Sequence, residues 1–101
     1  MIVYSVTVKI DLKAHSEWLE WMRNKHIPDV LATGKFVSHK LFKVLAEDET
    51  DGVTYNIQYF AKTMGDYFDY QNDHAQQLQA EHRERYQDKF VAFRTLLREI
   101  E

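Results

Sequence analysis

Residues suited to chemistry gather in the segment from His15 to Phe36 of this 101-residue sequence. The segment holds two of the five histidines, both tryptophans and the only proline. Because successive residues of an α-helix are rotated by about 100°, one side of a helix here carries His15, Trp18, Leu19, Met22 and His26. This pattern predicts an amphipathic helix whose apolar face, with its indole and imidazoles, forms part of a core or the wall of a pocket.

His26 is the candidate of greatest interest because it lies on the apolar face directly before Ile27 and Pro28, where the helix is expected to break or restart. A half-buried imidazole at this position can exchange protons near neutral pH. Alternatively, it binds terminal carbonyls and only caps the helix. Trp18 and Met22, on the same face, are likewise either core residues or part of a pocket wall.

Three residues outside this segment complete the candidates for ligand binding. His74 shares one side of a second expected helix with Leu78, so it is either a packed histidine or a pocket residue. Arg94 lies in an otherwise apolar strand and must find a partner or reach the surface, which makes it a dimer contact or an anion anchor. The candidate ligand-binding residues are therefore His26, Trp18, Met22, Tyr55, His74 and Arg94, whereas His15, His39 and His82 are expected at the surface or the rim.

The sequence offers little to a metal or a cofactor. It has no cysteine, which excludes thiolate ligands, disulfides and a cysteine nucleophile. No two histidines are four residues apart, the spacing that pairs two imidazoles on one helix face. The three glycines, at positions 34, 52 and 65, do not form a phosphate-binding loop or a dinucleotide fingerprint. We therefore expect neither metal nor cofactor, and we assign no catalytic residue.

The length and composition predict one domain over residues 1–101, with a single modest core. A net charge of −3 argues against a nucleic-acid surface, which relies on concentrated lysine and arginine. No apolar run approaches the roughly 20 residues that a membrane span needs, and the N-terminal residues alternate as in a strand rather than a signal peptide. Together with the lack of cysteine, these features favour a cytoplasmic protein without nucleic-acid or membrane partners.

Hydrophobic periodicity predicts four strands and two helices. Period-2 alternation marks the first and third strands most clearly, Thr63 is expected to cap the second helix, and Gly34 is expected to end the first helical segment in a left-handed conformation. The acidic segment Glu47–Gly52 is expected to be an exposed hairpin loop. The expected elements are a strand over Ile2–Ile10, a helix over Lys13–His26, an edge strand over Phe36–Ala46, a strand over Val53–Lys62, a helix over Met64–His82 and a strand over Phe90–Ile100.

This order predicts an α+β, ferredoxin-like βαββαβ fold, with a four-stranded antiparallel sheet and two helices on one face. Apolar residues at even positions of the first strand and odd positions of the third would meet the helices. The other face would carry Val3, Ser5, Thr7, Asn56, Gln58 and Phe60. Since nothing in one copy covers that mixed face, we expect it to be wet or to join two copies as a homodimer.

Three sequence segments resemble an uncharacterised bacterial family, a domain of unknown function in the dimeric α/β-barrel superfamily. They are Glu17–Met22, His26–Phe36 and Ala92–Thr95. The resemblance implies a homodimer in which two sheets pack as a barrel with helices outside. It brings no established catalytic residues. The superfamily includes cofactor-free monooxygenases, muconolactone-isomerase-like enzymes and haem proteins, which often bind ligands between sheet and helices, but these activities are too varied to transfer by fold.

Three functions therefore compete. The protein binds or transforms a small molecule in a cleft between sheet and helices, or it is a structural or regulatory homodimer without a ligand. RNA binding is the least favoured, because Tyr55 and Tyr59 lie in phase with core residues and the required Lys/Arg-Gly-Phe-Gly run is missing. A cavity lined by His26, Trp18 and Tyr55 would separate the first function from the second.

Overall fold

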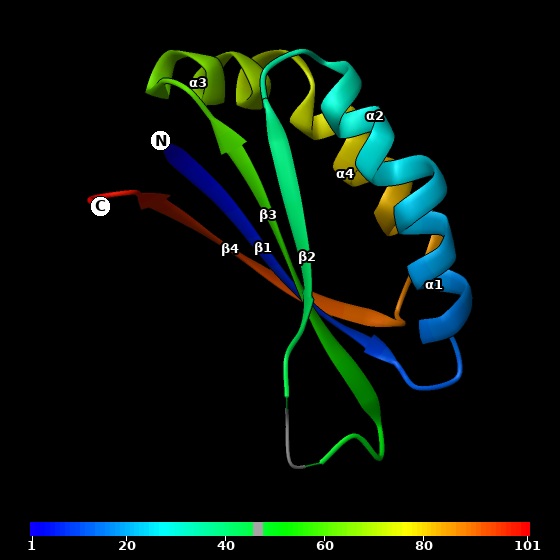
Figure 1. The fold of residues 1–101 in the computed structure, drawn as a ribbon. Helices are drawn as coiled ribbons and strands as arrows, with labels where there is room; N and C mark the ends of the chain where they lie inside the picture. Colours follow the sequence, from blue (N-terminus) through cyan, green and yellow to red (C-terminus); the bar gives the residue numbers. More distant parts are fainter. Residues whose placement is uncertain (46–47) are drawn as a thin grey trace.

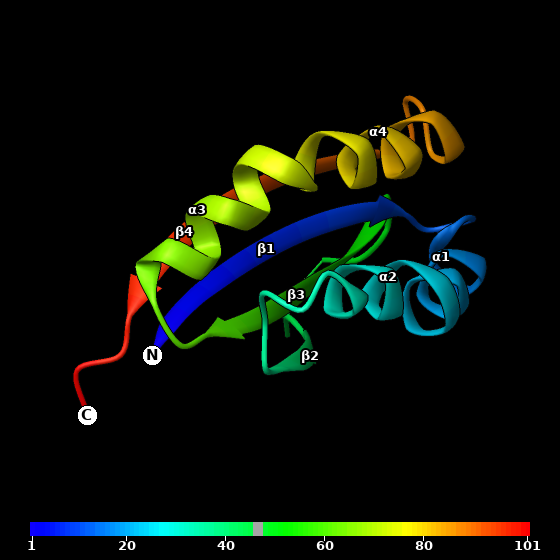
Figure 2. The same ribbon diagram turned by 90° about the horizontal axis from the view of Figure 1, so that it is seen from above.

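The computed structural model describes residues 1–45 and 48–101, and its strands form an antiparallel sheet in the order β2-β3-β1-β4 (Figure 1). The two helical segments lie on one face of this sheet (Figure 2). The predicted ferredoxin-like fold is thus confirmed. The strands are β1 (Ile2–Asp11), β2 (Ser38–Lys43), β3 (Gly52–Ala61) and β4 (Phe90–Arg98).

The first helical segment continues past Pro28. It consists of α1 (His15–Trp21), a π-helical turn η1 (Met22–His26) and α2 (Ile27–Ala32). The amide N–H of Ile27 bonds to the carbonyl of Met22, five residues earlier. This hydrogen bond therefore spans one residue more than in an α-helix. Pro28 then falls in the first turn of α2, where its missing N–H costs nothing. The helical chain therefore continues through the proline, and Gly34 follows α2 with the predicted left-handed conformation, at a φ of 79°.

The second helical segment is broken, although one helix over Met64–His82 was expected. It forms α3 (Met64–Asp73) and α4 (Ala75–Arg85), separated by His74, whose φ of −131° is not helical. The predicted cap is confirmed: the Thr63 hydroxyl accepts a hydrogen bond from the backbone N–H of Asp66 at 3.1 Å. The break changes the direction of the helix, so α3 and α4 follow the curved sheet along β1 and β4 (Figure 2).

The remaining boundaries are close to those expected. β2 is an edge strand, as predicted, but it is shorter than the interval Phe36–Ala46. Ala46 and Glu47, which belong to that interval and to the predicted acidic loop, lie outside the described residues. Among the described residues, no helix has both the length and the apolar character needed to cross a membrane.

The sheet presents two different faces. On the helix-covered face, Ile10 and Ile57 are completely buried, and Tyr4 lies opposite Tyr59 in the register of β1 and β3. On the open face, the Asn56 amide donates hydrogen bonds to the hydroxyls of Ser5 and Thr7 at 2.9 and 3.0 Å. The alternation predicted for these two strands is therefore what separates a core from a polar surface.

Candidate functional site

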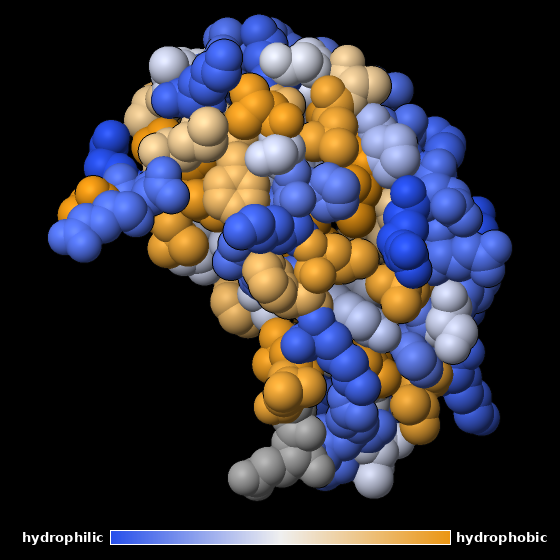
Figure 3. Space-filling view, viewed as in Figure 1, coloured by the Kyte–Doolittle hydropathy of each residue, from blue (hydrophilic) through white to orange (hydrophobic). Residues whose placement is uncertain are grey.

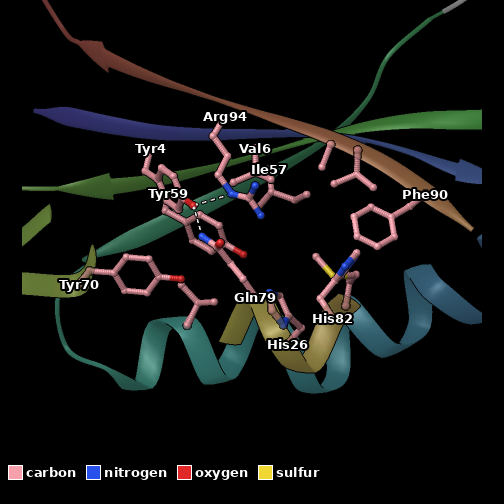
Figure 4. Close-up of a pocket in the computed structure, with 14 residues that line it drawn as sticks. Tyr4, Val6, His26, Ile57, Tyr59, Tyr70, Gln79, His82, Phe90 and Arg94 are labelled. Atoms are coloured by element: carbon pink, nitrogen blue, oxygen red, sulfur yellow. Dashed lines mark hydrogen bonds between the residues drawn. The ribbon is translucent and has the colours of Figure 1, made fainter. Parts of the chain in front are cut away.

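A pocket lies between the helix-covered face of the sheet and the helices (Figure 4). Its cavity volume is only about 30 Å³. The sheet wall consists of Tyr4, Val6, Val8, Ile57, Tyr59, Phe90, Ala92 and Arg94. The helix wall consists of Met22, His26, Val30, Tyr70, Gln79 and His82.

The polar end of the pocket is built around the hydroxyl of Tyr4. This oxygen accepts a hydrogen bond from Nε of Arg94 at 3.0 Å and another from the amide of Gln79 at 3.4 Å. Figure 4 shows Arg94 reaching from β4 toward the helix layer, with Gln79 approaching from α4. Among the described residues, no carboxylate lies within salt-bridge distance of Arg94. The pocket thus contains a guanidinium whose charge is balanced by no side chain that lines it.

His82 is held in one protonation state by Trp18. The indole Nε1 donates a hydrogen bond to Nε2 of His82 at 2.9 Å. Because an indole nitrogen can only donate, Nε2 carries no proton, and the neutral ring carries its proton on Nδ1. Burial lowers the pKa of His82 to about 4, and the neighbouring His26 and Arg94 act in the same direction. His82 is therefore a neutral hydrogen-bond donor at neutral pH.

His26 contributes a buried polar atom without a partner to the pocket. Its Nδ1 is buried and has no hydrogen-bond partner in the described part of the chain. The ring stacks on Trp21, with centroids 5.2 Å apart, and meets His82 edge-on at 5.7 Å. Burial lowers the pKa of His26 to about 4, although Asp29 favours the charged form. A buried nitrogen without a partner carries a desolvation cost that a bound water or ligand can relieve.

His26 does not cap the helix. It makes no side-chain capping hydrogen bond, and the helical chain continues through α2. Its position follows from the π-helical turn, which ends at His26 and widens the helix where it faces the pocket. The capping interpretation, left open by the sequence, is wrong.

The structure brings three of the six candidate residues together, because His26, Met22 and Arg94 line the pocket. Trp18 lies behind it, fully buried and bonded to His82, as a core residue. Tyr55 packs on Trp18, with ring centroids 5.2 Å apart, and lines a separate groove between the first helical segment and β2. His74 lies at the break between α3 and α4, where it stacks on Tyr70 at 6.4 Å.

The expectation that His82 lies at the surface or the rim is wrong, since only 8% of it is exposed. A signal for its burial was present in the sequence, because His82 shares one helical side with Ala75 and Leu78. The other missed residues of the site face inward from strands or helices that are far apart in the chain. They are Tyr4, Tyr59, Tyr70, Gln79 and Phe90. For the residues on strands, the inward alternation of side chains was the available signal. No signal identified Gln79.

The arrangement suits organic ligands better than metal ions. The described residues contain no group of three or more histidine, cysteine, aspartate or glutamate side chains placed to hold a metal. Two neutral imidazoles, one guanidinium and several aromatic rings instead provide hydrogen bonds and apolar contacts. The absence of a cofactor stays a prediction.

The comparison with protein families gives a match over nearly the whole chain. A family described as a domain of unknown function, DUF4286, matches residues 1–100. The chain belongs to the DUF4286 family. The resemblance stated from the sequence, to an uncharacterised family of this kind, is confirmed. No curated protein matches this DUF4286 chain.

Solved structures are similar to the DUF4286 chain in fold. A dimeric ferredoxin-like protein from an uncultured marine organism has a TM-score of 0.72 at 10% identity, over 100% of this chain and 96% of the other. A putative antibiotic biosynthesis monooxygenase from Bacillus cereus has a TM-score of 0.67 at 7% identity, over 99% and 93%. SnoaB, a cofactor-independent oxygenase from Streptomyces nogalater, has a TM-score of 0.63 at 12% identity, over 99% and 94%. At these identities the likeness shows the fold alone.

Proposed function

We propose that this DUF4286 protein binds a small organic molecule in the pocket between the sheet and the helices. The observation that carries the proposal is that one pocket contains both the buried, unpartnered Nδ1 of His26 and the guanidinium of Arg94. Arg94 is exposed, but a buried nitrogen such as Nδ1 of His26 normally has a partner. In ligand sites, a few such groups set the orientation of a molecule that is otherwise held by apolar walls.

The pocket is too small to admit a ligand unless a lining side chain moves. A cavity of about 30 Å³ holds only a few water-sized groups. Arg94 is exposed even though its guanidinium reaches the pocket. If this long side chain turns toward the pocket mouth, it opens space for a ligand, and its guanidinium can still meet the ligand there. The names of similar structures, an oxygenase and a putative monooxygenase, support a small-molecule role for this fold.

The test is a titration of isotope-labelled protein with a set of small aromatic fragments, followed by NMR. We expect shift changes centred on His26, His82 and Phe90. Ala92→Leu, which adds carbon atoms to the pocket wall, should weaken every fragment, whereas Ala32→Leu on the exposed side of α2 should not. If no fragment binds, or if Ala92→Leu leaves binding unchanged, the protein has no ligand pocket. The alternative predicted from the sequence, a structural or regulatory homodimer, would then be favoured.

We also propose that the protein forms a homodimer through the open face of the sheet. The polar centre of this face, around Asn56, is flanked by exposed apolar residues on the two edge strands. Figure 3 shows apolar side chains exposed among charged ones on the side where β2 lies in front. Exposed apolar residues at two edges of one face suit packing against another sheet. They are Phe42 on β2, Val44 directly after β2, and Val91, Phe93 and Leu97 on β4.

Light scattering tests the dimer. We expect twice the monomer mass at micromolar concentration, and a monomer for Phe93→Glu, because a buried carboxylate at this site would face a second apolar sheet. Phe68→Glu is the matched control, since Phe68 is also about half exposed (52%) but lies on α3. A wild-type monomer, or equal effects of the two substitutions, would contradict the proposal. A cytoplasmic location and a bacterial source remain predictions from the sequence.

A further inference from the structure

We infer that the ligand of this pocket is a small aromatic monoanion, such as an aromatic carboxylate, whose acidic group binds Arg94 and Tyr4 while its ring enters the apolar interior. The inference rests on the proposed function, because it names the class of molecule for the same pocket. It is carried by the donors at the polar end, by the uncharged interior and by a comparison of the arginines.

Arg85 and Arg94 each donate a hydrogen bond to a tyrosine hydroxyl, but they differ in how their charge is balanced. Arg85 donates a hydrogen bond to the carboxylate of Glu17 at 2.6 Å and lies over the ring of Trp21. Arg94 has only the phenol oxygen of Tyr4 as a hydrogen-bond partner in the described chain, and no acidic residue lines its pocket. A guanidinium at the exposed edge of an otherwise apolar pocket can bind a planar carboxylate, which accepts two parallel hydrogen bonds from it.

At the polar end of the pocket, Arg94 and Tyr4 both have donors left to offer. The oxygen of Tyr4 already accepts hydrogen bonds from Arg94 and Gln79, so the phenol proton is left to be donated. Arg94 can donate from its terminal nitrogens as well. A ligand group that only accepts hydrogen bonds complements this set, and an ionised carboxylate is such a group. A ligand ammonium would face the guanidinium and is excluded by repulsion.

The interior of the pocket carries no opposing charge. Tyr59 and Tyr70, which are 3% and 2% exposed, form aromatic walls together with Phe90. His26 and His82 line the interior as well. Both are neutral at neutral pH, because burial lowers the pKa of each to about 4. A second negative group on the ligand would therefore meet no cation in the interior. These walls favour a ring with one acidic group at one end.

Matched acids and amides test the class of ligand. Benzoate, phenylacetate and indole-3-acetate would be titrated by NMR against benzamide, phenylacetamide and indole-3-acetamide, which have similar shapes and no charge. We expect at least one acid to bind about 10-fold more tightly than its amide, because a charge-assisted pair replaces a neutral hydrogen bond. Benzylamine, which is cationic, should cause no shift change in the pocket.

Variants of two arginines on the same strand show whether Arg94 is responsible. Arg94→Gln should remove the preference for acids while the amides still bind, and Arg94→Lys should restore part of it. Arg98→Gln is the matched control, because Arg98 lies on the same side of β4 but does not line the pocket. Fragments that bind without a preference for acids, or a preference that survives Arg94→Gln, would overturn the inference but leave the pocket in place. Failure of every acid and amide to bind would overturn the proposed function itself.

Discussion

The two faces of the sheet are made from alternate residues of the same strands, yet they differ in how their polar side chains are hydrogen-bonded. On the open face, polar side chains bond to one another, as Asn56 does with Ser5 and Thr7. On the helix-covered face, aromatic rings exclude water, while the buried Nδ1 of His26 is left without a partner. The comparison teaches that, among the described residues of these two faces, a buried polar atom is left without a partner where the helices cover the sheet without filling the space beneath them.

The largest expected effect comes from removing a core side chain on the helix-covered face. Ile57 is completely buried in the central strand β3, so Ile57→Ala should lower the free energy of unfolding by about 2–5 kcal/mol. Gln58→Ala, at the next residue and on the open face, should change the free energy of unfolding by less than about 0.5 kcal/mol when both are measured in the monomeric variant Phe93→Glu. Urea unfolding measures both. Equal losses would show that the two faces do not differ in their packing.

Acid should lower the free energy of unfolding by protonating two histidines of the helix-covered face, His26 and His82. Their pKa values are about 4 in the folded protein, below the ordinary value of 6.5, so the unfolded chain binds more protons between these limits. Stability is therefore complete above about pH 6.5 and is lost as the pH falls toward 4. Between about pH 7 and about pH 5, we expect a loss on the order of 2 kcal/mol per histidine.

The measurement is urea unfolding across this range, in which most carboxylates remain ionised. His82→Gln should halve the dependence on pH, because the glutamine carbonyl can still accept the hydrogen bond from Trp18 while it cannot be protonated. His39→Gln, at an exposed position on β2, is the control and should leave the dependence intact. An unchanged pH dependence in His82→Gln would show that His82 is not buried as a neutral base.

Trp18→Phe separates the core behind the pocket from the pocket itself. The substitution removes part of a fully buried ring and the donor to His82, so we expect a loss of about 1–3 kcal/mol in unfolding free energy. Fragment affinities should change much less than stability, since Trp18 does not line the pocket. Thermal melts and fragment titrations measure the two effects. A large loss of affinity with unchanged stability would place Trp18 in the pocket wall.

The fold could be predicted from the sequence because it depends on short-range patterns. The alternation in β1 and β3, the cap at Thr63 and the left-handed Gly34 each depend on a few neighbouring residues. Element order and right-handed crossovers then leave few topologies. The β2 edge position follows from this order rather than from its own irregular pattern.

The site was predicted only in part because it depends on small rotations within helices. The π-helical turn before Ile27 and the break at His74 change which side chains face the sheet, and no sequence period reveals either of them. His26 and Arg94 were recognised as polar residues in apolar surroundings. Tyr4 and Gln79, which come from opposite ends of the chain, meet Arg94 only once the sheet and helices have assembled.

Among the substitutions on the helix-covered face, the smallest effect on stability is expected for His26→Gln, at the point where this face is incompletely packed. Nδ1 of His26 has no hydrogen bond to lose, and glutamine has a similar length, so the free energy of unfolding should change by less than about 1 kcal/mol. Loss of the stacking contact with Trp21 is the main cost. Any fragment that binds beside the imidazole should nevertheless bind several-fold more weakly, because the substitution changes the polar group that orients it. Calorimetric melts and the fragment titrations are made on the same samples, with His15→Gln as the control outside the pocket. A stability loss as large as that of Trp18→Phe, with affinities unchanged, would show that His26 serves packing on this face and not recognition.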